Sequence, residues 1–102
     1  MSLFSFLKKH DINEGVKSFR ATKGAVLIDV RTKEEYIERK IEGSINLPLD
    51  EIQKITSVVP DKATPIFLHC RSGKRSGKAQ KILTSMGYTN AVNIGGIIDY
   101  KG

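Results

Sequence analysis

The chain has 102 residues and a formal net charge of +6, with 39% hydrophobic and 27% charged residues. This length and composition correspond to one globular domain over residues 1–102, which can form an ordinary core without disulfides. No apolar run approaches the roughly 20 residues that span a bilayer, and the basic residues of the opening segment follow its apolar part, unlike those of a signal peptide. We therefore expect a cytoplasmic protein outside any membrane.

The beginning of the chain predicts one helix and one strand. Ile12, Val16 and Phe19 recur with the spacing of a single helix face. The apolar run over residues 25–29 is short and rich in β-branched side chains, which is typical of a buried parallel strand. These two segments would form the first helix and the first strand of an α/β fold.

A second helix and a second strand are expected next. Residues 32–40 have a helical pattern, and Thr32 and Glu35 have the spacing of a capping box, in which each side chain bonds the backbone of the other residue. A short strand over residues 44–48 would end at Pro48, which cannot donate to a sheet ladder.

The remaining elements continue this alternation. A short helix is expected over residues 49–55, with Asp50 as its N-terminal cap. Two further strands are predicted over residues 65–70 and 91–94. A helix between them, ended by Gly87, would carry an apolar stripe made by Ala79, Ile82, Leu83 and Met86.

The alternation of strands and helices predicts a short central parallel sheet with helices on both faces. Ligands of such sheets bind beyond the carboxyl ends of the strands. Cys70 stands at that end of the strand over residues 65–70. His69 would point to the opposite side of a regular strand, so we expect it to be structural and to bond nearby backbone.

The excess positive charge lies entirely around Cys70. Residues 1–61 contain ten basic and ten acidic residues, whereas residues 62–98 contain six basic residues and no acid. No aromatic residues interleave with these basic residues, which argues against nucleic acid and favours a small anion as the partner. Lys78 and Lys81 fit a solvated helix face equally well.

The stretch HCRSGKRS, residues 69–76, has the composition of a loop that ionises a thiol. A free thiol has a pKa of about 8.5, which cationic neighbours and a helix N-terminus lower. Gly73 permits the positive φ with which backbone N–H groups curl into an anion-binding nest. We therefore predict Cys70 as a nucleophile rather than a buried structural cysteine. The predicted substrate-binding residues are Arg71, Ser72, Gly73, Lys74, Arg75 and Ser76.

Metal and disulfide chemistry are not expected. Cys70 is the single cysteine, so no internal disulfide can form. His10 and His69 are far apart in the sequence, and no Cys/His cluster has the spacing of a zinc site. We therefore predict a site without metal or cofactor.

This loop resembles the active-site loop of rhodanese-like sulfurtransferases, Cys-x-x-Gly-x-Arg, at Cys70, Gly73 and Arg75. Residues 27–52 resemble the family's early signature, and residues 86–100 resemble its closing segment with paired glycines. The resemblance covers nearly the whole chain in the correct order. It implies the rhodanese-like fold in a single-domain version.

Two positions depart from the family's pattern. Arg39 and Lys40 stand where Gly-His is common, and Tyr100 stands where a tryptophan is usual. The last helix of the fold is expected to be short or absent. The resemblance also implies that Arg31 pairs with an acid such as Glu35 and holds the first helix at the strand end, which makes Asp29 and Arg31 structural. Apart from such a pair, we expect Glu34, Glu35 and Glu38 to form an acidic helix face.

The resemblance implies transfer of a sulfane sulfur from a donor such as thiosulfate, through a persulfide on Cys70, to cyanide or a thiol. The six residues from Cys70 through Arg75 match the loop length that the family associates with sulfur transfer, whereas phosphatase and arsenate reductase loops are one residue longer. Arg71 is typical of members that use thiosulfate.

Two other functions remain open. A non-catalytic binding or sulfur-carrier module is the first alternative, and an arsenate reductase or phosphatase is the second. The expected partners are a small anionic sulfur donor and a thiol acceptor, with a sulfur-relay protein as a further candidate, and neither nucleic acid nor membrane.

Overall fold

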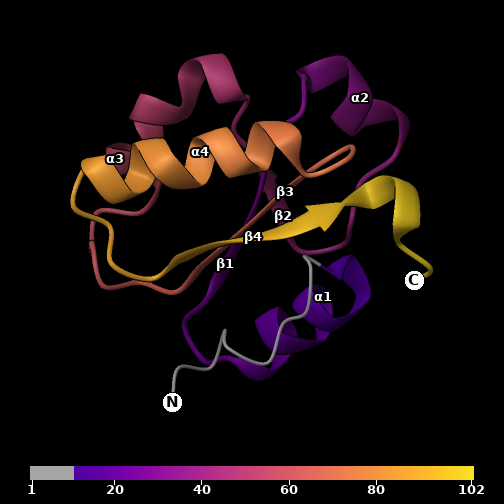
Figure 1. The fold of residues 1–102 in the computed structure, drawn as a ribbon, viewed down its shortest axis with the longest axis horizontal. Coiled ribbons are helices and arrows are strands. Elements are labelled where there is room, and N and C mark those ends of the chain that lie inside the picture. Colours follow the sequence, from indigo (N-terminus) through magenta and orange to yellow (C-terminus); the bar gives the residue numbers. More distant parts are fainter. Residues whose placement is uncertain (1–10) are drawn as a thin grey trace.

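A four-stranded parallel sheet forms the centre of the protein (Figure 1). The computed structural model describes residues 11–102, so the expectation about a signal peptide, and His10 with it, lies outside the described residues. The spatial order of the strands is β2-β1-β3-β4. The strands are β1 (Val26–Asp29), β2 (Ser44–Asn46), β3 (Ile66–Cys70) and β4 (Ala91–Gly96).

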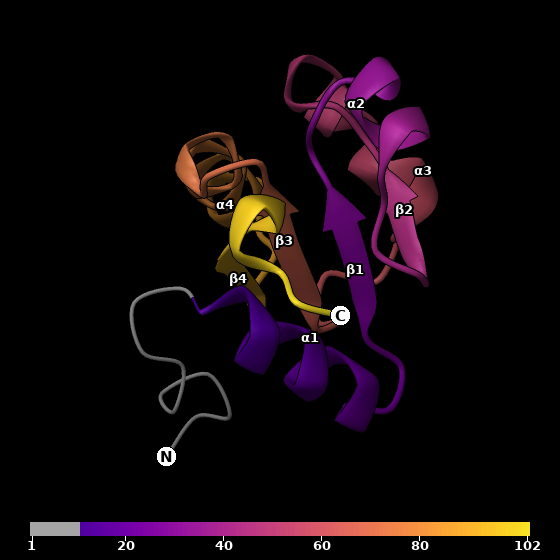
Figure 2. The same cartoon turned by 90° about the vertical axis from the view of Figure 1, so that its right-hand side faces the viewer.

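Helices cover both faces of this sheet, as Figures 1 and 2 show. One face packs against α1 (Ile12–Ala21), and the other packs against α4 (Lys74–Ser85) and the 3₁₀ helix η2 (Leu49–Lys54), which continues into the short α3 (Ile55–Val58). The predicted α/β architecture is confirmed. Within residues 11–102, no helix is both long and apolar enough to cross a membrane.

The two faces of β3 belong to different cores. Phe67 packs in the core on the α1 side, whereas Leu68 and Cys70 pack in the core on the α4 side. Because successive side chains of a strand point to opposite faces, His69 faces away from Cys70, as expected. This alternation places the thiol under the N-terminal end of α4.

The helix α2 (Lys33–Glu38) lies beyond the carboxyl end of β1 (Figure 2). Thr32 and Glu35 form the predicted capping box, each bonding the backbone N–H of the other. Beyond this helix, the Arg39 guanidinium donates to the carbonyls of Ile97 at 3.2 Å and Tyr100 at 3.0 Å. A residue that departs from the family's pattern therefore ties the end of α2 to the last residues of the chain.

The structure corrects one expected helix and confirms another expectation. Asp50 does not cap a helix, because the segment begins as a 3₁₀ turn at Leu49, directly after Pro48, without a side-chain cap. The last helix is reduced to the 3₁₀ turn η3 (Ile97–Asp99), in agreement with the expectation of a short or absent element.

The contact between α1 and β4 depends on Gly15. A Cβ atom at this position would lie 2.4 Å from the Cβ of Ile94, closer than packed carbon atoms allow. We predict that Gly15→Ala lowers the free energy of unfolding by about 1–3 kcal/mol, because overpacking exceeds the gain in helix propensity of about 1 kcal/mol. Denaturant unfolding measures this change. The exposed Lys17→Ala on the same helix should stay within about 0.5 kcal/mol of wild type, and equal stability of the two variants would contradict the close contact.

Candidate active site

The Cys70 side chain is fully buried beneath the loop that leads from β3 into α4. The loop directs its donors inward: the Gly73 N–H donates to Sγ at 3.0 Å, and the Ser76 hydroxyl lies 3.4 Å from Sγ. A buried thiol among apolar atoms alone would resist ionisation. Here backbone N–H groups point toward the sulfur, so they can stabilise a thiolate at this buried position.

These contacts lower the pKa of the Cys70 thiol below its ordinary value. Burial is the largest single influence and raises the pKa, but the hydrogen bonds from the Ser76 side chain and from the backbone N–H groups of Ser76, Gly73 and Ser72 together outweigh it. Donors that bond the charged form of an acid lower its pKa. The backbone N–H groups of the loop, which the sequence predicts to form an anion-binding nest, therefore lower this pKa together with the Ser76 hydroxyl.

Two glycines allow the loop to close over the sulfur. Gly73 has a φ of 102°, in the left-handed region that side chains other than glycine rarely adopt, and the next residue begins α4. Gly96 lies directly against the loop, where a Cβ would be 2.1 Å from the Arg71 carbonyl oxygen and 2.5 Å from the Ser72 Cα. The paired glycines at the end of β4 thus make room for the loop backbone.

Asn93 fastens this loop to β4. Its Nδ2 donates to the Gly73 carbonyl at 2.9 Å, and its Oδ1 accepts from the Ser76 hydroxyl at 2.7 Å and from the Gly95 N–H at 3.0 Å. Asn93 was not among the predicted site residues, although a polar side chain within the apolar strand AVNI is unusual enough to have marked it. Because Ser76 has one hydroxyl proton, it donates either to Asn93 or to Cys70 at any moment.

Arg75 lies in the first turn of α4 and forms a bidentate ion pair with Glu35 of α2. Its Nη1 and Nη2 atoms lie 2.7 Å and 3.0 Å from the two carboxylate oxygens. The hydrogen bond from Arg75 is the main cause that lowers the pKa of Glu35 to about 2. Glu35 is therefore a link between two helices and not part of a solvated acidic face.

Arg31 pairs with Asp29 and not with the Glu35 carboxylate. Its Nη2 lies 2.7 Å from the Asp29 Oδ2, and its guanidinium also donates to the main-chain carbonyls of Glu35 and Arg39. The predicted acid was wrong, but the predicted consequence holds, since this arginine secures α2 at the end of β1.

His69 has the structural role that the sequence analysis expected. Its Nδ1 lies 3.2 Å from the Cys70 carbonyl oxygen, and its Nε2 lies 3.7 Å from the Asp29 Oδ2. Burial lowers the pKa of His69 more than the negative charge of Asp29 raises it. A neutral imidazole therefore supports the backbone of Cys70 from the opposite face of the sheet.

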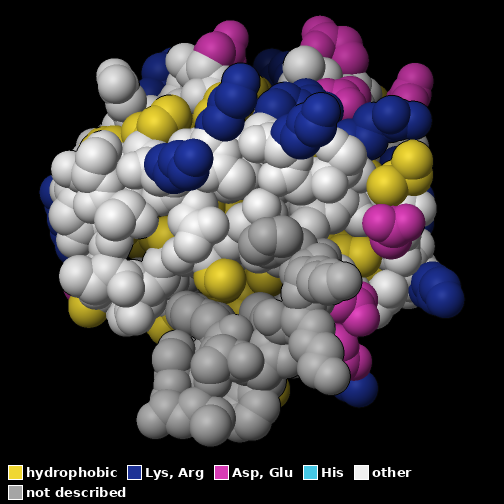
Figure 3. Space-filling view, in the orientation of Figure 1, with side chains coloured by type: hydrophobic (Ala, Val, Ile, Leu, Met, Phe, Trp, Pro, Cys, Tyr) yellow, Lys and Arg dark blue, Asp and Glu magenta, His cyan; other side chains and the backbone are white. Residues whose placement is uncertain are grey.

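The other predicted site residues lie at the surface. The structure brings Ser72, Gly73 and Ser76 to the sulfur, but Arg71 and Lys74 are exposed. The Arg71 carbonyl accepts a hydrogen bond from the Ile98 N–H at 3.2 Å, which anchors the loop to η3. Figure 3 shows Lys and Arg side chains gathered along the upper part of this face, over α4.

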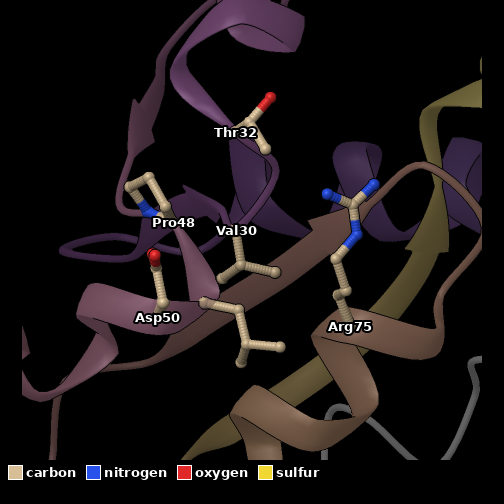
Figure 4. A pocket seen from close by; sticks show the side chains of 6 residues that line it. Val30, Thr32, Pro48, Asp50 and Arg75 are labelled. Atoms are coloured by element: carbon tan, nitrogen blue, oxygen red, sulfur yellow. The ribbon is translucent and has the colours of Figure 1, made fainter.

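A pocket of about 410 Å³ opens beside the loop. Arg75 rises from α4 on one side of it, and Thr32, Pro48 and Asp50 lie on the other (Figure 4). Val30 forms part of the wall, and its N–H donates to the His69 carbonyl at 3.0 Å, so the wall adjoins the residue before Cys70. The lining is mostly apolar, with one cationic and one anionic side chain.

Comparison with known proteins identifies the family. A family model described as "Rhodanese-like domain" matches residues 13–101. The chain therefore belongs to the rhodanese-like domain family. Its fold also matches a solved structure of a rhodanese with anions from Escherichia coli, with a TM-score of 0.71 and 42% identity over 74% of this chain and 91% of that chain.

Two curated relatives have names that state an activity. The chain is 44% identical to the thiosulfate sulfurtransferase PspE of Escherichia coli K12, over 71% of this chain and 70% of that protein. It is 40% identical to the thiosulfate:glutathione sulfurtransferase of Saccharomyces cerevisiae, over 64% of this chain and 55% of that protein. Both relatives are named as enzymes that transfer sulfur from thiosulfate.

The donors around Sγ lead to a prediction about ionisation. Asn93→Ala would release the loop and Ser76→Ala would remove a donor, so each should raise the pKa of Cys70 and slow its alkylation by iodoacetamide several-fold at neutral pH. The pH profile of the alkylation rate measures this effect. Thr84→Ala removes a hydroxyl elsewhere on α4 and should leave the profile unchanged. Unchanged profiles in both loop variants would contradict the assigned roles.

The ion pair between Glu35 and Arg75 leads to a prediction about stability. The folded-state pKa of Glu35 is about 2, below its ordinary 4.5, so its contribution is present above pH 4.5 and is lost as the pH falls toward 2. Glu35→Gln should therefore unfold about 1 kcal/mol more easily than wild type at pH 7, since the pair is partly exposed. Denaturant unfolding at pH 7 and at pH 3 should show this difference shrinking, and a difference independent of pH would refute it.

Proposed function

We propose that the protein is a thiosulfate sulfurtransferase that carries the transferred sulfur as a persulfide on Cys70. The observation that supports this most directly is the buried sulfur at the end of β3, onto which backbone N–H groups converge and whose pKa is lowered. The enzyme class also rests on the relatives, since the thiosulfate sulfurtransferase PspE is 44% identical to this chain. The proposed substrate-binding residues remain those of the loop, residues 71–76.

The first half-reaction uses Cys70 as a nucleophile. Its thiolate attacks the outer sulfur of thiosulfate, a bond forms between Sγ and that sulfur, and the bond to the central sulfur breaks. Sulfite leaves with the electron pair, and a persulfide remains on Cys70. The N–H groups of Ser72, Gly73 and Ser76 stabilise the negative charge in the reactant thiolate and in the persulfide anion alike.

The second half-reaction returns the enzyme to its starting state. An acceptor thiolate or cyanide attacks the terminal sulfur, and the Cys70 Sγ leaves as a thiolate stabilised by the same donors. Because the nucleophile, a thiolate or cyanide, and the leaving thiolate are both anions, no side chain needs to act as a general acid. The yeast relative named for glutathione supports a thiol as the acceptor. The free Cys70 thiol is compatible with the proposed location in the reducing cytoplasm.

The alternatives have weaker support. The loop from Cys70 through Arg75 has six residues, whereas phosphatases and arsenate reductases are expected to have one more, which would enlarge the ring of N–H groups around the sulfur. A purely binding module does not require a lowered thiol pKa. A sulfur carrier would use the same persulfide, and differs only in receiving its sulfur from another protein.

Incubation with thiosulfate should add one sulfur atom to Cys70. We expect intact-mass and peptide mass spectrometry to locate this atom on the peptide containing residue 70, and cyanide to remove it with formation of thiocyanate. Cys70→Ser should gain no sulfur, while its fold, checked by circular dichroism, stays native. A wild-type protein that gains no sulfur from thiosulfate, or that hydrolyses an aryl phosphate through Cys70, would contradict the proposal.

A further inference from the structure

Four cationic side chains form a basic face that begins at the Cys70 loop and follows α4. The basic face consists of Arg71, Lys74, Lys78 and Lys81, all of them exposed. Positions 74, 78 and 81 follow the i, i+4, i+7 spacing that places residues on one side of a helix. The Lys and Arg side chains over α4 in Figure 3 make this concentration visible.

The charges of the basic face are available to a partner. Within residues 11–102, none of its four side chains forms an ion pair or a side-chain hydrogen bond, whereas Arg75 on the same helix is paired with Glu35. Residues 62–98 contain no acidic residue that could neutralise them. The positive potential of this face is therefore directed outward into solvent.

This face extends further than a small sulfur donor requires. Lys78 and Lys81 lie about 6 Å and about 10 Å beyond Lys74 along the helix axis, at a rise of about 1.5 Å per residue. The charge of Lys81 lies beyond the Debye length of about 8 Å in physiological salt and is largely screened at the loop, and that of Lys78 is partly screened. An anion of the size of thiosulfate at Cys70 is attracted only weakly by Lys78 and Lys81. An elongated anionic partner that reaches these two lysines is attracted much more strongly.

We propose that the basic face docks an acidic segment of a second protein, whose cysteine thiol accepts the sulfur carried by Cys70. This inference rests on the proposed function. In the step itself the partner's thiolate attacks the terminal persulfide sulfur, a new S–S bond forms on the partner, and the Cys70 Sγ leaves as a thiolate. Docking at Lys78 and Lys81 would hold the partner while its thiol reaches the adjacent loop.

The residues of this face favour a protein over a nucleic acid. Three of the four are lysines, which act as point charges, and the face lacks the aromatic side chains on which bases stack. Phe67 and Tyr88, the aromatic residues of the segment 62–98, are both buried. An acidic polypeptide also supplies the thiol that this reaction consumes.

The test compares protein variants against one acidic acceptor. Wild-type protein is loaded with sulfur by thiosulfate, and transfer to a synthetic peptide with one cysteine among glutamates is followed by mass spectrometry under single-turnover conditions at low salt. The double variant Lys78→Glu/Lys81→Glu should transfer sulfur about tenfold more slowly to this peptide, because its local charge is reversed. Added salt should slow the wild type and reduce the difference.

The matched control changes the same net charge on the opposite side of the sheet. Arg20 and Lys23 are exposed at the end of α1 and in the turn after it, and Arg20→Glu/Lys23→Glu should keep at least half of the wild-type rate. Turnover of thiosulfate with cyanide should stay within about twofold of wild type in both double variants, since neither pair touches the loop.

Three results would overturn docking while leaving the proposed function intact. The first is persulfide formation followed by equal transfer from wild type and Lys78→Glu/Lys81→Glu. The second is an equal loss in the control variant, which would show an effect of net charge alone. The third is tighter binding of a single-stranded oligonucleotide than of an acidic peptide of equal charge. If no persulfide forms with thiosulfate, the proposed function itself fails.

Discussion

The site depends on hydrogen bonds donated to a fully buried sulfur atom. Burial alone would keep the Cys70 thiol protonated, and it is the largest single influence on its pKa. The N–H groups of the loop reverse that effect because they are fixed dipoles in a region of low dielectric, where each hydrogen bond to a charge is stronger than in water. The left-handed Gly73 and the bare backbone of Gly96 make this arrangement sterically possible, and Asn93 holds it in place.

The charged groups around the site have separate tasks. Arg31 and Asp29 join the end of β1 to α2, while Arg75 and Glu35 join α2 to the first turn of α4. These pairs use Arg31 and Arg75 to join elements, and the hydrogen bonds that lower the pKa of Cys70 come from neutral donors. The four cations of the basic face, which begins at the Cys70 loop and continues along α4, have no acidic partner within residues 11–102.

The sequence predicted the secondary structure well because its periodicities are local. The capping box at Thr32 and the apolar stripe of α4 both correspond to the observed helices. Asp50 was wrongly predicted as a cap because Pro48 itself takes the extended conformation that precedes a helix. The 3₁₀ helix therefore begins at Leu49, and Asp50 already lies inside it. The partner of Arg31 was misjudged for a different reason, since two acids lie within reach in sequence and only packing chooses between them.

The sequence by itself determined the parallel α/β fold, the candidate thiol at the end of β3 and the concentration of positive charge beside it, since each follows from composition and short-range spacing. The tertiary structure alone decided how the loop is held around the thiol. Asn93 and Ser76 are seventeen positions apart, and Arg75 and Glu35 are forty apart. Such contacts depend on how β4, α2 and α4 converge at one edge of the sheet. The two apolar cores place β4 and α4, whereas α2 buries no residue and is held by Arg31 and Arg75.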